Sequence, residues 1–474
     1  MNFNSFTFIF LFLPAALVGF YVLGTMQAKA SLKPWLLAAS LAFFAAGRLQ
    51  DLPLLMASIT FNCIVATRLT SFPDRSRGRC AVFVLGLSGN LLFLAYFKYK
   101  AFLVALANQW MGLHLAVSRP LFPLGISFYT VYQIMLLVDC YENLAQNYNW
   151  RDHLVFAGFF PYVTMGPIVR WKQIVPQLNG SDFGKPRWDN LARGLYIFVI
   201  GLFKKVVLAD SFFRWSDAGF NFAGSLSLVG AWITALAFTC QLYFDFSGYT
   251  DMAIGVALMF NINLPANFNT PYRSQSVIEF WRRWHITLSN FITTYLYTPM
   301  IRGMRKVSFG RMMLVTFIAM LITGFWHGAS WTFVVFGSLH GLGLVANQVW
   351  KRCKCQMPGP IAWALTFIFV VITFVFFNSR DLSQAGEIVR SMFSIRTAVF
   401  SYEPWLGIDR IDQAAGIVWM LLGTFILYRA PSSQTLQQNF RPSWVTVAAT
   451  IALAAAALLY TNGVVSRSFV YRDF

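Results

Sequence analysis

Apolar segments separated by short polar or basic breaks recur along the whole chain, and this pattern limits the folds open to it. Of the 474 residues, 57% are hydrophobic and only 12% are charged, which is about half the charge of an ordinary soluble chain. A soluble domain of this size would lack the polar side chains to cover its surface. Inside lipid, the backbone polar groups must bond within the chain, so we predict an all-α integral membrane protein.

The apolar segments differ in length. They lie near residues 6–26, 35–46, 52–67, 81–97, 101–117, 121–138, 154–169, 195–209, 227–244, 252–264, 312–326, 331–349, 361–377, 414–428 and 444–460. Several are shorter than the about 20 residues that cross a bilayer, and such pieces occur as re-entrant or broken helices inside protein. We expect about 11–13 transmembrane helices plus re-entrant and interfacial helices. No polar stretch is long enough for a second domain, so residues 1–474 form a single polytopic membrane domain.

Basic residues set the expected orientation. Lys and Arg number 37 against 18 Asp and Glu, and they lie mostly between apolar segments, as in cytoplasmic loops. Because no polar basic module is present, we do not expect nucleic-acid binding. Three clusters mark cytoplasmic loops: Arg68, Arg75, Arg77 and Arg79; Arg302, Arg305, Lys306 and Arg311; and Lys351, Arg352 and Lys354. The last two flank residues 312–349, which predicts an apolar hairpin returning to the cytoplasmic side with His327 near its turn.

Histidines inside apolar segments are candidates for function, because an ionisable group is costly in a bilayer. His327 lies between Trp326 and the small residues 328–330, which permit close backbone approach. A neutral imidazole there can act as a general base near physiological pH. It can equally be a core histidine bonded to a carbonyl, and the residues favour neither interpretation. Of the remaining histidines, His340 fits either kind of role, while a structural role is favoured for His114 and His153.

His285 ends the segment that runs from Glu279 through Trp281, Arg282 and Arg283. On a continuous helix, Trp281 and His285 would share one face. The simple interpretation is an interfacial amphipathic helix with a tryptophan belt. The sharper one adds a cationic groove in which Arg282 and Arg283 bind the phosphate of a donor molecule.

Asp245 and Asp251 lie at the end of an apolar segment, on either side of Gly248. They can form a proton relay, but we favour a structural role in which they cap and pin a helix broken around Gly248. The chain has no Gly-rich phosphate loop, metal-ligand spacing or serine elbow. The residues alone therefore indicate a membrane enzyme or a transporter with a histidine in the bilayer.

Seven segments spread over the chain carry a resemblance to a known family. They are PLGISFY at 123–129, FFPY at 159–162, GPIVR at 166–170, GLFKK at 201–205, the run 241–255, the run 280–289 and TGFWHGASW at 323–331. Together they resemble the membrane-bound O-acyltransferase (MBOAT) family, in particular its bacterial alginate O-acetyltransferase-like branch. One departure is visible, because relatives usually have an Arg-Asp pair where this chain has Thr293-Thr294.

The resemblance implies helices around a central funnel, with His327 and His285 as catalytic residues. Trp326, Trp281, Arg282, Arg283 and Asp245 would contact substrates. It also implies no bound cofactor, acetyl-coenzyme A as the cytoplasmic thioester donor, and a hydroxyl acceptor on an exported polysaccharide such as an alginate-like polymer, cellulose or peptidoglycan. A separate periplasmic acyltransferase would be the partner, and the bacterial inner membrane the location.

In this interpretation His327 accepts the proton of the attacking hydroxyl or takes the acetyl group itself. Two alternatives remain open. The first is an acyltransferase for another acyl group or acceptor, such as D-alanyl or a lipid. The second is a non-enzymatic transporter, although the sequence lacks the pseudo-symmetric halves typical of carriers.

Overall fold

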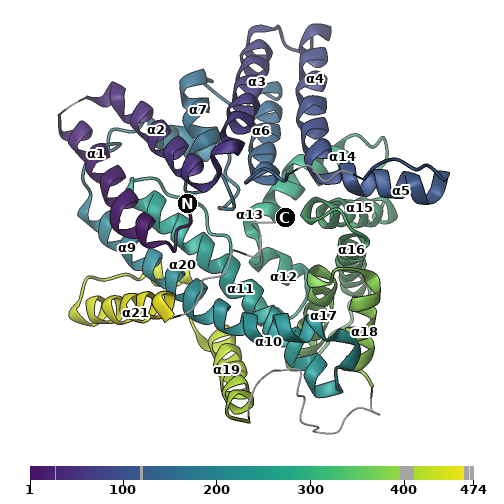
Figure 1. The fold of residues 1–474 in the computed structure, drawn as a ribbon. Helices are drawn as coiled ribbons and strands as arrows, with labels where there is room; N and C mark the ends of the chain where they lie inside the picture. Colours follow the sequence, from purple (N-terminus) through teal and green to yellow (C-terminus); the bar gives the residue numbers. More distant parts are fainter. Residues whose placement is uncertain (27, 118–120, 395–409, 464–468, 470–474) are drawn as a thin grey trace.

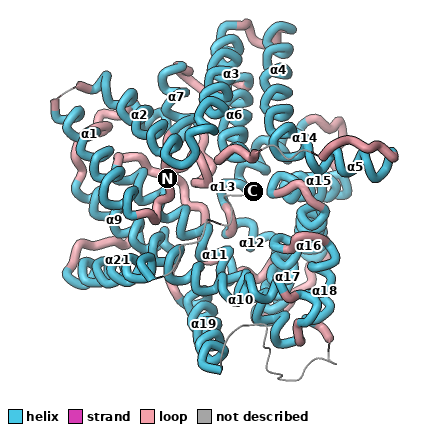
Figure 2. Tube along the Cα trace, viewed as in Figure 1, coloured by secondary structure: helices cyan, strands magenta, loops and turns pink. Residues whose placement is uncertain are grey.

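The computed structural model describes residues 1–26, 28–117, 121–394, 410–463 and 469, and within them the chain forms helices and loops but no strand (Figures 1 and 2). The helices are α1 (Leu13–Thr25), α2 (Lys29–Arg48), α3 (Leu52–Ser71), α4 (Arg77–Leu94), α5 (Lys100–Met111), α6 (Ile126–Tyr141), α7 (Trp150–Gly158), α8 (Trp171–Leu178), α9 (Trp188–Phe203), α10 (Asp210–Asn221), α11 (Leu228–Met259), α12 (Val277–Arg283), α13 (Ile286–Phe291), α14 (Thr298–Arg302), α15 (Phe309–His327), α16 (Trp331–Arg352), α17 (Gly359–Asn378), α18 (Leu382–Met392), α19 (Arg410–Arg429), α20 (Ser433–Gln438) and α21 (Trp444–Gly463). The predicted all-α class is confirmed.

Eight helical stretches in the described part of the chain are long and apolar enough to cross a membrane. One of them, Lys29–Ser71, contains two helices of 20 residues each, α2 and α3. The eight stretches are fewer than the 11–13 helices expected, because some apolar segments became short helices or loops. Segment 154–169, for example, gives the nine-residue α7 followed by a non-helical loop.

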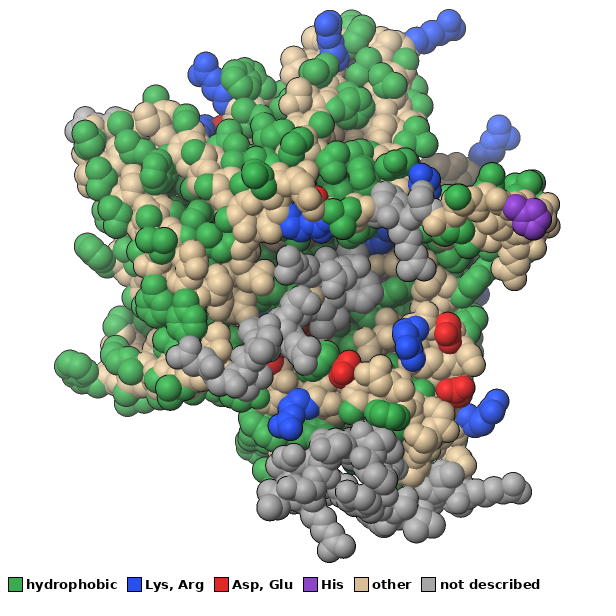
Figure 3. All heavy atoms as spheres, viewed as in Figure 1, with side chains coloured by type: hydrophobic (Ala, Val, Ile, Leu, Met, Phe, Trp, Pro, Cys, Tyr) green, Lys and Arg blue, Asp and Glu red, His purple; other side chains and the backbone are tan. Residues whose placement is uncertain are grey.

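The outer surface carries the apolar side chains that lipid requires. Hydrophobic side chains cover much of the face shown in Figure 3, and charged side chains are sparse there. Large apolar residues are exposed along the outer helices, with Leu92 of α4 69% exposed and Val445 of α21 78% exposed. Such exposure would be costly in water but is expected for helices in contact with lipid.

Helix α11 runs through the middle of the molecule and packs on α9 and α10 (Figure 1). Segments 227–244 and 252–264 are therefore mostly one 32-residue helix, and the predicted break around Gly248 is wrong. The glycines instead allow close packing of two backbones. A side chain at Gly248 would lie 2.8 Å from the carbonyl oxygen of Gly201, and one at Gly255 would lie 2.5 Å from that of Gly194.

Helices α15 and α16 form the predicted hairpin, joined by residues 328–330. Their backbones touch at two glycines, since a side chain at Gly324 would lie 2.7 Å from the Cα of Gly337. Helix α15 has 19 residues and so rises about 28 Å, close to the thickness of a bilayer core. His327 is its last residue. It therefore lies at the end of the hairpin opposite the basic clusters at 302–311 and 351–354.

Candidate active site

His327 is held at the end of α15 in an aromatic environment. It is only 3% exposed, and its ring centroid lies 5.0 Å from that of Trp326 and 5.3 Å from that of Phe377. It also interacts electrostatically with His285, His340 and Lys98. The structure therefore brings together three histidines and one lysine that are far apart in the sequence.

His285 lies between two short helices rather than on one. Helix α12 ends at Arg283 and α13 begins at Ile286, and His285 has the left-handed backbone angles φ 43° and ψ 52°. The prediction that Trp281 and His285 share a helix face is therefore wrong. Nδ1 of His285 lies 3.0 Å from Oδ1 of Asn267, and its ring packs edge-on against Phe246. Burial lowers the pKa of His285 to about 3, so the ring is neutral at pH 7.

Trp281 faces the protein interior and not the membrane surface, which contradicts the predicted tryptophan belt. It is 7% exposed, and its indole nitrogen donates a hydrogen bond of 3.2 Å to Nδ1 of His340. Nε2 of His340 lies 3.0 Å from the hydroxyl of Thr373. With both ring nitrogens bonded, His340 positions Trp281 and α12 against α16 and α17.

Lys98 adds a buried hydrogen-bond donor beside His327. Its Nζ donates hydrogen bonds to the carbonyl oxygen of Trp326 and, at 2.9 Å, to the hydroxyl of Ser127. It also lies 5.6 Å from the Trp326 ring. No carboxylate in the described ranges pairs with Lys98. Lys98 was not among the residues predicted from the sequence, because it falls between two apolar segments, where a lysine is expected in a loop.

Trp326 is half-buried next to this lysine. Its indole nitrogen is buried and has no hydrogen-bond partner among the described residues. Buried donors are normally bonded, so an unbonded one beside a candidate catalytic histidine is a donor available to a ligand. This placement agrees with the predicted substrate contact, which stays a prediction.

The two other predicted histidines lie elsewhere. His153 is fully buried, with Nε2 at 2.8 Å from Gln133 and Nδ1 at 3.0 Å from the hydroxyl of Tyr148. This bonding is structural, as expected. His114 lies in the exposed stretch after α5.

Asp245 and Asp251 are tied to lysines of the segment after α9. Asp245 lies 2.7 Å from Lys205, which is itself 1% exposed. Lys205 also contacts Asp210 at 2.8 Å, and Asp251 contacts Lys204 at 2.7 Å. These ion pairs hold α11 against its neighbours, which is the pinning role favoured from the sequence. None of these contacts places Asp245 beside His285 or His327.

Arg282 and Arg283 do not form the expected cationic groove. Arg282 is exposed, and Arg283 pairs with Glu279 at 2.8 Å. Two cationic side chains instead line a cavity of about 530 Å³. They are Arg170, directly before α8, and Lys172, within α8. This cavity lies near the basic 68–79 loop, to which it is connected by Asn143, a residue that lines the cavity and bonds to Arg79.

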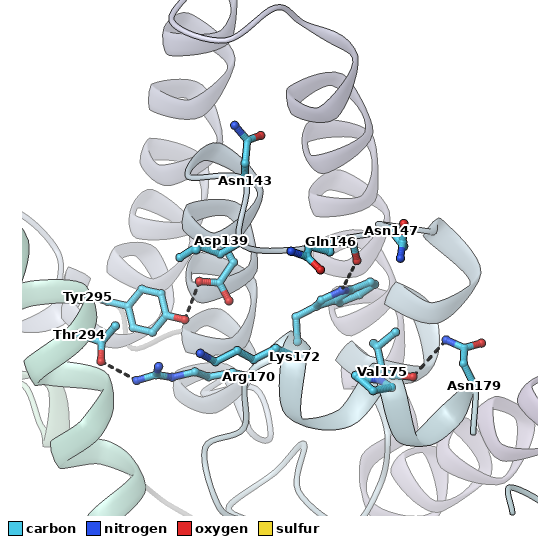
Figure 4. A pocket seen from close by; sticks show the side chains of 13 residues that line it. Asp139, Asn143, Gln146, Asn147, Arg170, Lys172, Val175, Asn179, Thr294 and Tyr295 are labelled. Carbon is cyan, nitrogen blue, oxygen red and sulfur yellow. Dashed lines mark hydrogen bonds between the residues drawn. The ribbon is translucent and has the colours of Figure 1, made fainter. Parts of the chain in front are cut away.

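Figure 4 shows how the side chains of this cavity are arranged. The Tyr295 hydroxyl donates to Asp139 at 2.8 Å, and Arg170 donates to the hydroxyl of Thr294 at 2.5 Å. Burial raises the pKa of Asp139, against the hydrogen bond of Tyr295 and the charges of Arg170 and Lys172, which lower it. Within the described residues Arg170 makes no direct ion pair, and its partner at position 294 is the neutral hydroxyl of a threonine. The cavity therefore offers a guanidinium and an ammonium group to an anion.

A second cavity, of about 420 Å³, lies at the turn that joins α15 and α16. It is lined by one residue of α5, by the residues that follow His327, and by the residues before and at the start of α18: Phe102, Ala329, Ser330, Trp331, Thr332, Arg380, Asp381, Leu382 and Ser383. Its hydroxyl and aromatic side chains suit a polar organic ligand. His327 thus lies beside the residues of one cavity, on the side away from the basic loops.

Comparison with known proteins identifies the family. Residues 83–380 match the model of MBOAT, the membrane-bound O-acyltransferase family. The chain is 35% identical to the peptidoglycan O-acetyltransferase of Helicobacter pylori, over 100% of this chain and 97% of that protein. It is 37% identical to the probable alginate O-acetylase AlgI of Pseudomonas aeruginosa, over 84% of this chain and 76% of that protein. It is 29% identical to the teichoic acid D-alanyltransferase of Streptococcus thermophilus, over 49% of this chain and 58% of that protein.

Proposed function

Because the chain belongs to the membrane-bound O-acyltransferase family and is a multi-pass membrane acyltransferase, we propose that it transfers an acetyl group across the membrane. The donor is a cytoplasmic thioester, acetyl-coenzyme A, and the acceptor is a hydroxyl group destined for an exported polysaccharide. The location is the bacterial inner membrane. A periplasmic acyltransferase is the expected partner that completes delivery to the polymer.

The observation that carries the proposal is the buried group around His327. His285 and His327 interact electrostatically, both are at most 3% exposed, and aromatic rings surround them. Such a site excludes water, which would otherwise hydrolyse a thioester. A neutral imidazole in it can accept the proton of an attacking hydroxyl.

The cation-lined cavity near α8 supports a donor from the basic, cytoplasmic side. Coenzyme A carries phosphate groups, and arginine and lysine are the usual residues that bind phosphate. A volume of about 530 Å³ lies within the range of small-ligand sites, about 300–1,000 Å³. Arg170 and Lys172 replace Arg282 and Arg283 as the proposed donor contacts.

The names of the relatives support an acetyl group and a glycan acceptor. The full-length relative is named for peptidoglycan and the next for alginate, and both names specify acetyl transfer. The D-alanyltransferases match only about half of this chain and at lower identity. We therefore favour acetyl over D-alanyl as the group transferred.

The test is replacement of His327 by Ala in the producing cell, with O-acetyl groups measured on the exported polymers. We expect acetylation to be lost while the protein remains in the membrane at normal abundance. His114→Ala, at an exposed position, is the matched control and should leave acetylation unchanged. Normal acetylation by His327→Ala would contradict the proposal, and turnover of purified protein with acetyl-coenzyme A but not other acyl donors would identify the acyl group.

A further inference from the structure

The side-chain oxygen of Asn267 determines which nitrogen of His285 carries the proton. Oδ1 of Asn267 accepts the backbone N–H of Thr287 at 3.2 Å and the Thr287 hydroxyl at 2.8 Å. A backbone N–H can only donate, so the atom facing it must be the amide oxygen and not the NH₂ group. Nδ1 of His285 lies 3.0 Å from the same oxygen. It must therefore donate, and the neutral ring carries its proton on Nδ1.

The other ring nitrogen then has a lone pair and nothing bonded to it. Nε2 of His285 is buried and has no hydrogen-bond partner among the residues that the structure describes, and the whole side chain is 0% exposed. A buried polar atom without a partner is rare in a native structure. In a cluster that also contains His327, such an acceptor is suited to a ligand that donates a hydrogen bond.

The backbone around His285 is held by the same asparagine. The positive φ of 43° at this non-glycine residue is strained and persists only where surrounding contacts impose it. The backbone carbonyl of Asn267 accepts the N–H of Ile286 at 2.9 Å, so both the main chain and the side chain of Asn267 bind the turn. The orientation of the ring is therefore set before any ligand binds.

His340 has the opposite proton arrangement, because its own hydrogen-bond partners differ. Nδ1 of His340 accepts the indole N–H of Trp281, which can only donate. The hydroxyl of Thr373 donates to the carbonyl of Val370 at 2.8 Å, so it accepts from Nε2–H of His340. The structure thus gives two buried histidines of opposite tautomers.

We propose that Asn267 is a positioning residue that fixes His285 in the Nδ1-protonated tautomer, so that Nε2 of His285 accepts a hydrogen bond from the acceptor hydroxyl. The identity of the hydroxyl, on a carbohydrate or on a partner that passes the acyl group to one, rests on the function proposed above. The tautomer rests on the Asn267 contacts alone. The proposal assigns alignment of the hydroxyl to His285 and leaves contact with the acyl group to His327.

Nitrogen NMR of ¹⁵N-histidine-labelled protein in lipid bilayers tests the tautomer without any substrate. We expect one neutral histidine with a protonated Nδ1 whose signal disappears in His285→Asn. In Asn267→Leu the same signal should move or split as the ring takes both tautomers. Asn62→Leu is the matched control, because Asn62 is also a fully buried asparagine with side-chain hydrogen bonds, in α3. It should leave the signal in place.

Kinetics of the same variants test the role of Nε2. Asn267→Leu should lower kcat at least about tenfold, by analogy with residues that orient ligating histidines, with an unchanged KM for acetyl-coenzyme A, while Asn62→Leu lowers thermal stability but not kcat. The side chain of His285→Gln can place its amide oxygen near the position that Nε2 of His285 occupies in the wild type. This variant should therefore keep more activity than His285→Asn. A wild-type signal for protonated Nε2 at His285 overturns the proposal, as does unchanged kcat in Asn267→Leu. A wild-type protein with the expected signal but without acyl transfer would instead refute the proposed function.

Discussion

Replacing Gly324 by alanine places a methyl group where the backbones of α15 and α16 meet, three residues before His327. The methyl carbon would lie 2.4 Å from the carbonyl oxygen of Phe333 and 2.7 Å from the Cα of Gly337. Atoms of this kind make favourable contact only from about 3.5 Å outward. Because the obstacles are backbone atoms, relief requires the two helices to separate by about 1 Å.

Two effects follow from that displacement. Overpacking of this kind destabilises a protein by about 1–3 kcal/mol. Displacement of a catalytic group by about 1 Å lowers the rate by about 10²-fold. We therefore expect Gly324→Ala to remain folded but to lose about two orders of magnitude in kcat, with a smaller change in the KM for the donor.

The assay is acetyl transfer from labelled acetyl-coenzyme A by purified protein in lipid, together with the thermal unfolding midpoint of each variant. Gly310→Ala is the matched control, because Gly310 lies in the same helix and no atom of the described residues lies within 4 Å of the position that a Cβ would take there. It should behave as the wild type in both measurements. If Gly324→Ala has wild-type kcat, the contact at Gly324 does not determine where His327 lies and the reasoning fails.

Three further changes follow from the site. Thr294→Asp gives Arg170 a carboxylate partner, so the KM for acetyl-coenzyme A should rise about tenfold, or about 1.4 kcal/mol. Thr293→Asp, at the neighbouring exposed position, should change this KM less. Equal KM values for the two variants would exclude this cavity as the donor site. Lys98→Met removes a hydrogen-bond donor beside the buried histidines and should lower kcat about tenfold or more. A change in the donor KM alone would contradict this role. His153→Leu removes a ring with two hydrogen bonds and should lower stability by about 1–3 kcal/mol with kcat unchanged, and a selective loss of kcat would contradict a structural role.

The membrane class and the α15–α16 hairpin were accessible from the sequence because both depend on local composition. Low charge, long apolar segments and basic loops are properties of neighbouring residues. They placed His327 at the end of a hairpin, and the structure confirms that placement. The same local pattern predicted a helix break at Gly248, although the role of this glycine depends on Gly201, a residue of another helix.

The details of the site depend on contacts between distant segments and were not accessible. The left-handed backbone at His285 is imposed by Asn267, and a helical pattern through Trp281 gave no sign of it. Lys98 reaches Trp326 across more than two hundred residues of sequence. The donor cavity was missed because Arg170 and Lys172 lie in a short loop and helix whose partners, Tyr295 and Thr294, come from another part of the chain. The departure at Thr294 was visible, but its contact with Arg170 was not.

The central claim is that acyl transfer crosses the membrane through the site of His327 and His285. Protein reconstituted in sealed vesicles of known orientation tests it most directly, with labelled acetyl-coenzyme A supplied on the side of the basic loops and a hydroxyl-bearing glycan or partner enclosed on the other. We predict labelled acceptor on the side opposite the donor, and none with His327→Ala. Label confined to the donor side, or equal label with the histidine replaced, would contradict the account.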